Sequence, residues 1–103
     1  MNQQIFQEIQ TLKRQILPNE KVILFGSQAR GDARPDSDWD LLVLLNKEKG
    51  NFNEDYDKYV WPFAELGMKY RALINAKVYT VKDWEAHPSL FRYNVKQDGI
   101  EIL

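Results

Sequence analysis

Two aspartates spaced two residues apart, and a glycine–serine pair upstream of them, are the residues of this sequence whose types and spacing can do chemistry. Asp38 and Asp40 open the apolar run LLVLL, and Gly26-Ser27 ends the apolar run VILF. Side chains at positions i and i+2 of a strand point to the same face, so the two carboxylates are expected to lie side by side. A glycine–serine turn after a strand is typical of phosphate-binding loops. Together these features predict metal-assisted phosphoryl chemistry.

The same segment offers separate groups for a phosphate chain and for a metal ion. Backbone N–H groups at Gly26 and Ser27, with the Ser27 hydroxyl, are predicted to contact a phosphate tail. Arg30, one helical turn later, is predicted to pair with a phosphate oxygen. Asp38 and Asp40 are predicted to hold one or two Mg²⁺ ions, because Mg²⁺ prefers a few carboxylates together with phosphate oxygens and water. Two such ions would stabilise the attacking and leaving oxygens of an in-line displacement.

The hydrophobic pattern predicts the alternating helices and strands that place these residues. In chain order we expect a helix over 2–17, a strand over 21–25, a helical turn over 27–30, a loop over 32–37, a strand over 38–45, a charged loop over 46–51, a helix from 52 to about 72, a strand over 73–80, a short helix over 81–86 with Thr80 as its N-cap, a helix from Ser89 to about 97, and a closing strand over 100–103.

Two of these elements carry further expectations. The strand over 38–45 is apolar on both faces beyond Asp40, which predicts a central strand covered on both sides, with Trp39 in the core and facing away from the carboxylates. Pro62 is expected to kink or divide the long helix. The aromatic residues that recur on that helix from Phe52 to Tyr70 are expected to pack in the core, with a protein interface as the alternative.

The composition is that of a small soluble protein. The chain has 103 residues, 44% of them hydrophobic and 28% charged, which predicts one domain over 1–103. A net charge of −1 argues against duplex DNA as a ligand. Without cysteine and with His87 as the single histidine, disulfides, thiolate zinc sites and histidine metal clusters are excluded. No apolar run is long enough for a membrane, and the polar start differs from a signal peptide, so we expect a cytoplasmic protein.

The ordered segment from Leu24 to Val43 resembles a known family signature. An apolar strand, the run Gly-Ser-x-Ala-Arg-Gly, a loop, and Ser-Asp-x-Asp at the start of a second apolar strand follow one another. This resembles the DNA polymerase β-like nucleotidyltransferase superfamily in its minimal, MNT-type form. The later stretch VYTVKDWEAHPSLFRYNVKQDGIEI is also similar to the tail of the minimal members, though less specifically.

The resemblance implies a fold, an activity and a partner. The expected fold is α/β (α+β), a polymerase β-like nucleotidyltransferase fold with a small mixed β-sheet flanked by helices. The implied activity is Mg²⁺-dependent transfer of a nucleoside monophosphate from an NTP, with ATP as the expected donor, to a hydroxyl acceptor. Several minimal members pair with a small helical HEPN-type protein as antitoxin and toxin, and some adenylylate that partner on tyrosine. For this chain, the partner follows from the resemblance alone.

One departure from the family pattern concerns the base for the attacking hydroxyl. The full site of the family carries a third carboxylate on a later strand, beside the aspartate pair. The matching strand here, 73–80, has no acid, and the face expected to point toward the site carries Asn75 and Lys77 instead. Asn75 can orient a hydroxyl but is a poor base. Lys77 can pair with Asp38 or Asp40 and compete with a metal ion, or contact phosphate.

Several alternatives follow from this departure. If the site is vestigial, Arg30 is as well suited to bridging Asp36 or Asp38 as to contacting phosphate. The chain is then a regulatory module that keeps nucleotide binding, has weakened catalysis, and acts by binding a partner. The apolar face of Leu42 and Leu44 is covered either within the chain or by a second copy of it, so a homo-oligomer stays open. The sequence does not define the base preference or the acceptor.

Overall fold

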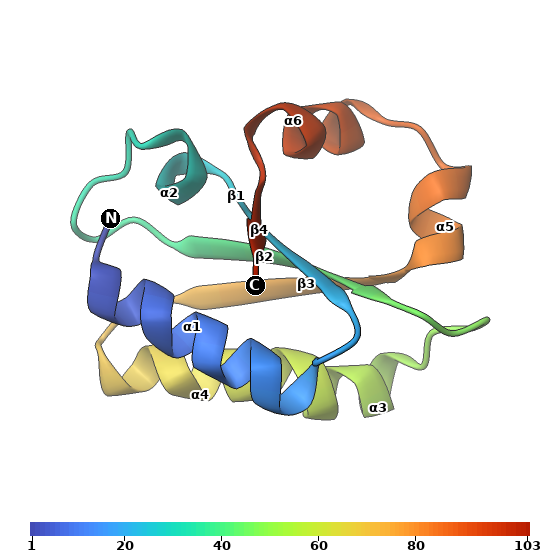
Figure 1. The fold of residues 1–103 in the computed structure, drawn as a ribbon, viewed down its shortest axis with the longest axis horizontal. Helices are drawn as coiled ribbons and strands as arrows, with labels where there is room; N and C mark the ends of the chain where they lie inside the picture. The colour runs from blue at the N-terminus through green and yellow to red at the C-terminus, as the bar shows by residue number, and fades with distance from the viewer.

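A four-stranded mixed sheet forms the centre of the computed structural model, which describes residues 1–103 (Figure 1). The strands lie in the order β3-β2-β1-β4; β1 pairs antiparallel with β2 and β4, whereas β2 and β3 run parallel. Their bounds are Lys21–Phe25 for β1, Trp39–Leu45 for β2, Ile74–Thr80 for β3 and Ile100–Ile102 for β4. All four predicted strands are therefore confirmed, each to within one residue at either end.

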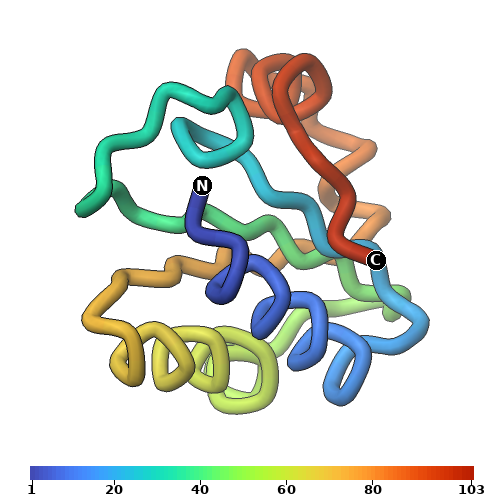
Figure 2. Tube along the Cα trace, turned by 60° about the vertical axis from the view of Figure 1, so that its left-hand side comes forward, coloured from blue at the N-terminus to red at the C-terminus, as the bar shows by residue number.

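The helices cover both faces of this sheet (Figures 1 and 2). On one face lie α1, α3 and α4, and on the other lie α5 and α6, so the domain has three layers. No helix is both long and apolar enough to cross a membrane. The helical bounds are Gln3–Ile16 for α1, Ser27–Arg30 for α2, Phe52–Asp55 for α3, Trp61–Lys69 for α4, Val81–Ala86 for α5 and Leu90–Asp98 for α6.

Strand β2 is the buried centre of the sheet, as its sequence predicts. Its odd-numbered side chains pack beneath α1 and α4 in the larger apolar cluster, and Trp39 there is 2% exposed. Leu42 and Leu44 face the other way and pack against Val95 of α6, with Trp84 and Phe91 around them. That face is therefore covered within the chain. Burying each of these leucines contributes about 1.5–3 kcal/mol, so β2 anchors both layers.

The long predicted helix is divided into three parts. Between α3 and α4 the residues Tyr56–Val60 form a π-helical turn, η1, in which the Trp61 N–H donates to the Tyr56 carbonyl. Pro62 then lies in the first turn of α4, directly after the π-helical turn, where its missing N–H interrupts the hydrogen bonds of the helix. The predicted division near Pro62 is therefore confirmed, although the segment has three parts rather than two and α4 ends at Lys69 rather than near 72.

The aromatic stripe of this region is core in only part of its length. Phe63 is completely buried, whereas Phe52 is 84% and Tyr56 42% exposed. The rings of Phe52 and Tyr56 stack on each other, with their centroids 6.3 Å apart and their planes inclined at 27°. The prediction of a core stripe is therefore wrong for these two residues, because the π-helical turn changes the face that the chain presents to the sheet.

Asp55 is the buried carboxylate that ties the loop after β2 to α3. Only 5% of the residue is exposed; it accepts hydrogen bonds from the Lys47 ammonium and, at 2.8 Å, from the Asn51 N–H. Burial acts to raise the pKa of Asp55, but these two hydrogen bonds and the Lys47 charge outweigh it and lower that pKa. The ionised pair therefore adds stability above the unfolded-state pKa of Asp55, and this stability is lost as the pH falls through the folded-state value.

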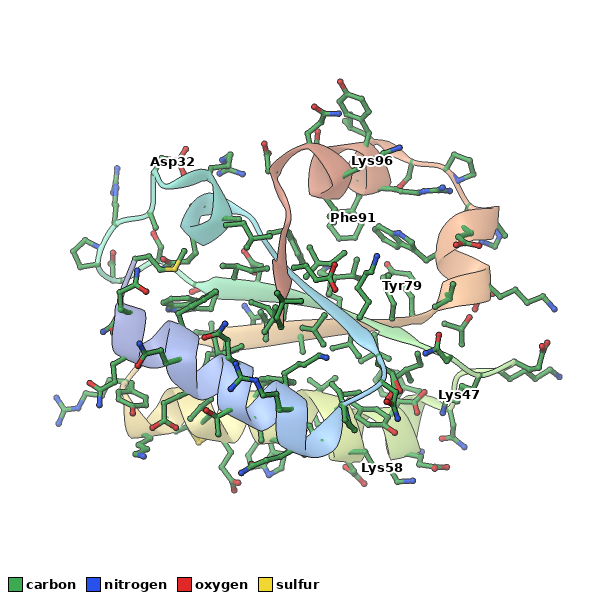
Figure 3. The ribbon with its side chains drawn as sticks, in the orientation of Figure 1. Asp32, Lys47, Lys58, Tyr79, Phe91 and Lys96 are labelled. Carbon is green, nitrogen blue, oxygen red and sulfur yellow. The ribbon has the colours of Figure 1, made fainter.

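Replacing Lys47 with methionine should lower the free energy of unfolding by about 1–3 kcal/mol, because it leaves a buried carboxylate without its cation. Urea unfolding at neutral pH measures this loss. Lys58→Met is the matched control, since Lys58 makes a 2.7 Å ion pair with Glu54 on the exposed side of the same helical segment (Figure 3). That control should leave stability nearly unchanged. Equal losses in the two variants would contradict the assigned role of Asp55.

Candidate active site

Asp38 and Asp40 lie at the start of β2, where the strand emerges from its two covering layers. Asp38 immediately precedes the strand and is exposed, while Asp40 is its second residue and is half-buried. Trp39, between them, packs into the opposite face. Both carboxylates therefore belong to the face of the sheet that α5 and α6 cover farther along, as the alternation of the sequence predicts.

Gly26 brings the backbone of the glycine–serine turn against Asp40. The last residue of β1, Phe25, lies opposite Asp40 in the antiparallel register. The next residue, Gly26, has φ +77°, and a Cβ placed on it would lie 2.6 Å from the Asp40 Oδ2 atom. A side chain at this position would displace the carboxylate. The glycine thus permits both the sharp turn and the close approach.

The short helix α2 and the following loop are fastened together by Gln28. Gln28 is 4% exposed, and its Nε2 atom donates to the Ser37 carbonyl at 3.2 Å. Ser37 also closes its own turn, since its Oγ accepts from the Arg34 N–H at 2.8 Å. These bonds fix the backbone that leads into Asp38. Gln28 was not predicted as a site residue, because its only signal in the sequence is a polar residue at the variable position of Gly-Ser-x-Ala-Arg.

Arg30 has a different partner from those considered in the sequence. Its Nε atom lies 3.3 Å from Asp32 Oδ2, and both side chains are largely exposed at the end of α2 (Figure 3 labels Asp32). The bridges to Asp36 or Asp38, which were the alternative for a vestigial site, are not formed, because Gly31, with φ +83°, turns the chain so that Asp32 follows beside Arg30. An exposed pair of this kind contributes little stability, so the guanidinium can exchange Asp32 for another anion at small cost.

Strand β3 places Asn75 beside the aspartates and Lys77 farther along. Asn75 lies opposite Asp40 in the parallel register, and its Nδ2 atom donates to Asp38 Oδ2 at 3.3 Å. Lys77 forms no ion pair with either aspartate; its ammonium lies 5.5 Å from the centre of the Phe91 ring. Of the contacts expected for Lys77, pairing with the aspartates is therefore wrong. No three acidic or histidine side chains gather at one point in the structure.

The pKa of Asp40 is raised above its ordinary value. Burial is the largest cause, and the negative charge of Asp38 is the second. The Asn75 amide and the positive charges of Lys77 and Arg30 act in the opposite direction without cancelling these two effects. The ionised carboxylate pair is thus held under mutual repulsion, and a cation between the two would relieve it. The donor set, two carboxylates beside an open backbone turn, suits a divalent ion that prefers oxygen ligands.

The chain belongs to the nucleotidyltransferases, as its sequence relationships show. Residues 7–103 match the sequence model of the family described as "Polymerase beta, Nucleotidyltransferase", so the chain is a member of that family. A relative from Methanocaldococcus jannaschii, provisionally named a protein adenylyltransferase, is 35% identical over 85 residues, which cover 81% of this chain and 78% of the relative. The family resemblance of the segment Leu24 to Val43 is therefore confirmed.

Solved structures share the fold. A chain of a toxin–antitoxin structure with AMP-PNP superposes with a TM-score of 0.67 at 20% identity, over 100% of this chain and 73% of its own length. A chain of the toxin–antitoxin structure MntA-HpeT gives a TM-score of 0.63 at 18% identity, over 95% of this chain and 71% of its own. At these identities the likeness establishes the fold, which is the predicted mixed α/β nucleotidyltransferase fold.

Mg²⁺ should raise the thermal unfolding midpoint of the parent protein and leave that of the double variant Asp38→Asn/Asp40→Asn unmoved.

In the absence of metal, Asp40→Asn alone should be slightly more stable than the parent at neutral pH. The sign follows from the raised pKa: the fold disfavours the ionised form, so stability rises as the pH falls through that pKa. The gain should stay below about 1 kcal/mol, because solvent screens a half-exposed group. Thermal melts with Mg²⁺ and with EDTA measure both effects.

Gly26→Ala should abolish the Mg²⁺-induced shift of the unfolding midpoint, because the new Cβ pushes Asp40 out of place. Gly31→Ala is a close control: Gly31 also has positive φ, +83°, but a Cβ there meets no atom within 4 Å. Both variants pay on the order of 1 kcal/mol for the backbone conformation. Only Gly26→Ala should lose the metal response, and a similar response in the two variants would argue against the contact with Asp40.

Proposed function

We propose that this chain transfers a nucleoside monophosphate from ATP, with Mg²⁺, to a hydroxyl group of a protein. The observation that carries the proposal is the apposition of the Gly26 turn and Asp40, with Asp38 on the same face, in a member of a nucleotidyltransferase family. The donor and the acceptor are inferred from the relatives: one is named as a protein adenylyltransferase, and a structural neighbour was solved with AMP-PNP.

In the proposed mechanism, the turn at Gly26 and Ser27 holds the phosphate tail. Its backbone faces Asp40, and the Ser27 hydroxyl lies at the first position of α2, next to the glycine. Arg30, at the other end of α2, exchanges its exposed contact with Asp32 for a phosphate oxygen. Gln28 keeps this turn fixed to the loop before Asp38. The two halves of the site then keep their spacing while the nucleotide binds.

Asp38 and Asp40 are the proposed ligands of the divalent metal. When bound, Mg²⁺ supplies positive charge that neutralises the phosphate oxygens and stabilises the displacement. Asn75 holds Asp38 in place through its amide. In the reaction the acceptor oxygen attacks the α-phosphorus, the bond from that phosphorus to the bridging oxygen breaks, and pyrophosphate leaves. Because no third acid is present, we infer that the proton of the acceptor hydroxyl passes to water rather than to a side chain of the protein.

The acceptor proposed is a tyrosine of a small helical HEPN-type protein, in a toxin–antitoxin pair. The toxin–antitoxin structures among the neighbours support this choice, and the chain itself does not define the acceptor further. A second candidate function is a regulatory module that binds nucleotide and partner with little turnover. The observation that favours it is Asn75 at the point on β3 where a base would be useful.

Labelled ATP with Mg²⁺ tests the proposed activity. The chain is incubated with the product of the neighbouring gene and with ATP labelled at either the α- or the γ-phosphate. Label from the α-position alone should appear on the partner, which distinguishes nucleotidyl from phosphoryl transfer. Asp38→Asn/Asp40→Asn should reduce transfer at least about a thousandfold, because both metal ligands are lost.

The outcomes separate the two candidate functions. Transfer that survives the double substitution would overturn the site. Binding of ATP and of the partner without transfer would favour the regulatory module, and Asn75→Asp should then raise the rate of transfer. Lys82→Met, on α5 and paired only with the exposed Glu48, serves as a surface control that should not alter the rate.

A further inference from the structure

Lys77 is a cation on the same face of the sheet as the candidate site. It lies two residues beyond Asn75 on β3, opposite Leu42 of β2, so it shares its face with Asn75 and with Asp40. Lys77 is exposed and takes part in none of the ion pairs of the structure. A lysine on the surface of a small protein needs no partner, but the ammonium of this one lies over an aromatic ring.

An aromatic cluster holds the Lys77 side chain. Its ammonium lies 5.5 Å from the centre of the Phe91 ring. Phe91 is itself fixed by edge contacts to Phe25, at 5.2 Å and 73°, and to Trp84, at 5.6 Å and 88°. Figure 3 shows Phe91 below α6, above the strands, with Tyr79 nearby on β3. Because Phe25 directly precedes Gly26, the same cluster links the ammonium to the turn beside Asp40.

The charge of Lys77 acts on the Asp40 carboxylate although no ion pair forms. Burial raises the pKa of Asp40 most, and the Lys77 charge is among the effects that oppose it. The ammonium is thus close enough to act on charges at the site, yet it is not neutralised by them. Arg30 differs in this respect, since it already has Asp32 as a partner.

The charge balance of the site gives Lys77 a use. The triphosphate of ATP and the carboxylates of Asp38 and Asp40 are all negative, so without a divalent ion any positive charge at the site must come from the protein. We propose that the Lys77 ammonium, which lies over the Phe91 ring, binds a phosphate of ATP, so that the site keeps part of its affinity for ATP when no divalent metal is present. This inference rests on the proposed function. It assigns a role to Lys77, which lies on the strand that carries the third carboxylate in the family pattern.

Calorimetric titration of ATP in EDTA, and again in Mg²⁺, tests the inference. In EDTA the parent should bind ATP, and Lys77→Met should weaken that binding about tenfold, which corresponds to the loss of one charge-assisted contact. Lys77→Arg should retain most of the affinity. In Mg²⁺ the effect of Lys77→Met should be smaller. Lys82→Met is the matched control for the loss of one positive charge and should bind like the parent.

The readings distinguish this inference from the proposed function. If Lys77 has a purely structural role, Lys77→Met should weaken ATP binding equally in EDTA and in Mg²⁺ and should also lower the unfolding midpoint. Thermal melts of each variant measure that midpoint, and this result would overturn the inference. The inference is also overturned if Lys77→Met and the parent bind ATP equally well in EDTA, or if the parent binds no ATP in EDTA. In either case, binding of ATP in Mg²⁺ would still support the proposed function. Failure of the parent to bind ATP even in Mg²⁺ overturns both.

Discussion

The site depends on one close approach, that of the Gly26 backbone to the Asp40 carboxylate. Two antiparallel strands meet there, β1 ending in the turn and β2 beginning with the acids, and their register sets Phe25 opposite Asp40. Both faces of β2 are covered, so a one-residue slip of the register would turn the carboxylates of Asp38 and Asp40 toward the apolar layer that holds Trp39. The apolar core therefore fixes the position of the candidate site. The absence of a side chain on Gly26 leaves room for the Asp40 carboxylate beside the turn.

The sequence predicts those parts of the fold that a local pattern determines. The alternation of Trp39, Leu41 and Val43 against Asp40 and Leu42 gives both faces of β2, and the structure confirms it. Glycine, proline and capping residues place nearly every boundary, since they restrict the backbone whatever surrounds them. The family signature from Leu24 to Val43 is of the same kind, because its spacing reflects one turn and one pair of strands.

Contacts that depend on how a loop or turn folds could not be predicted from the sequence pattern. Gln28 reaches the Ser37 carbonyl, and Lys47 reaches Asp55, only because of how the loops fold back. Arg30 has several aspartates nearby in the sequence, and the turn at Gly31 places Asp32 beside it. The π-helical turn exposed Phe52 and Tyr56, which a helical wheel places in the core. In each case a side chain selects its partner in three dimensions, and the sequence offers several partners of equal chemical suitability.

The parallel pairing of β2 with β3 has a consequence for how the protein is made. Asp38 and Asn75, which touch in the folded structure, are 37 residues apart in the chain. Parallel strands need a long crossover, which here consists of α3, η1 and α4. Closing so long a loop costs conformational entropy before any contact across it is formed. A nascent chain therefore exposes its aspartates well before Asn75 and Lys77 can join them. The candidate site is therefore assembled only after β3 has been synthesised and has docked, in the slow, non-local part of folding.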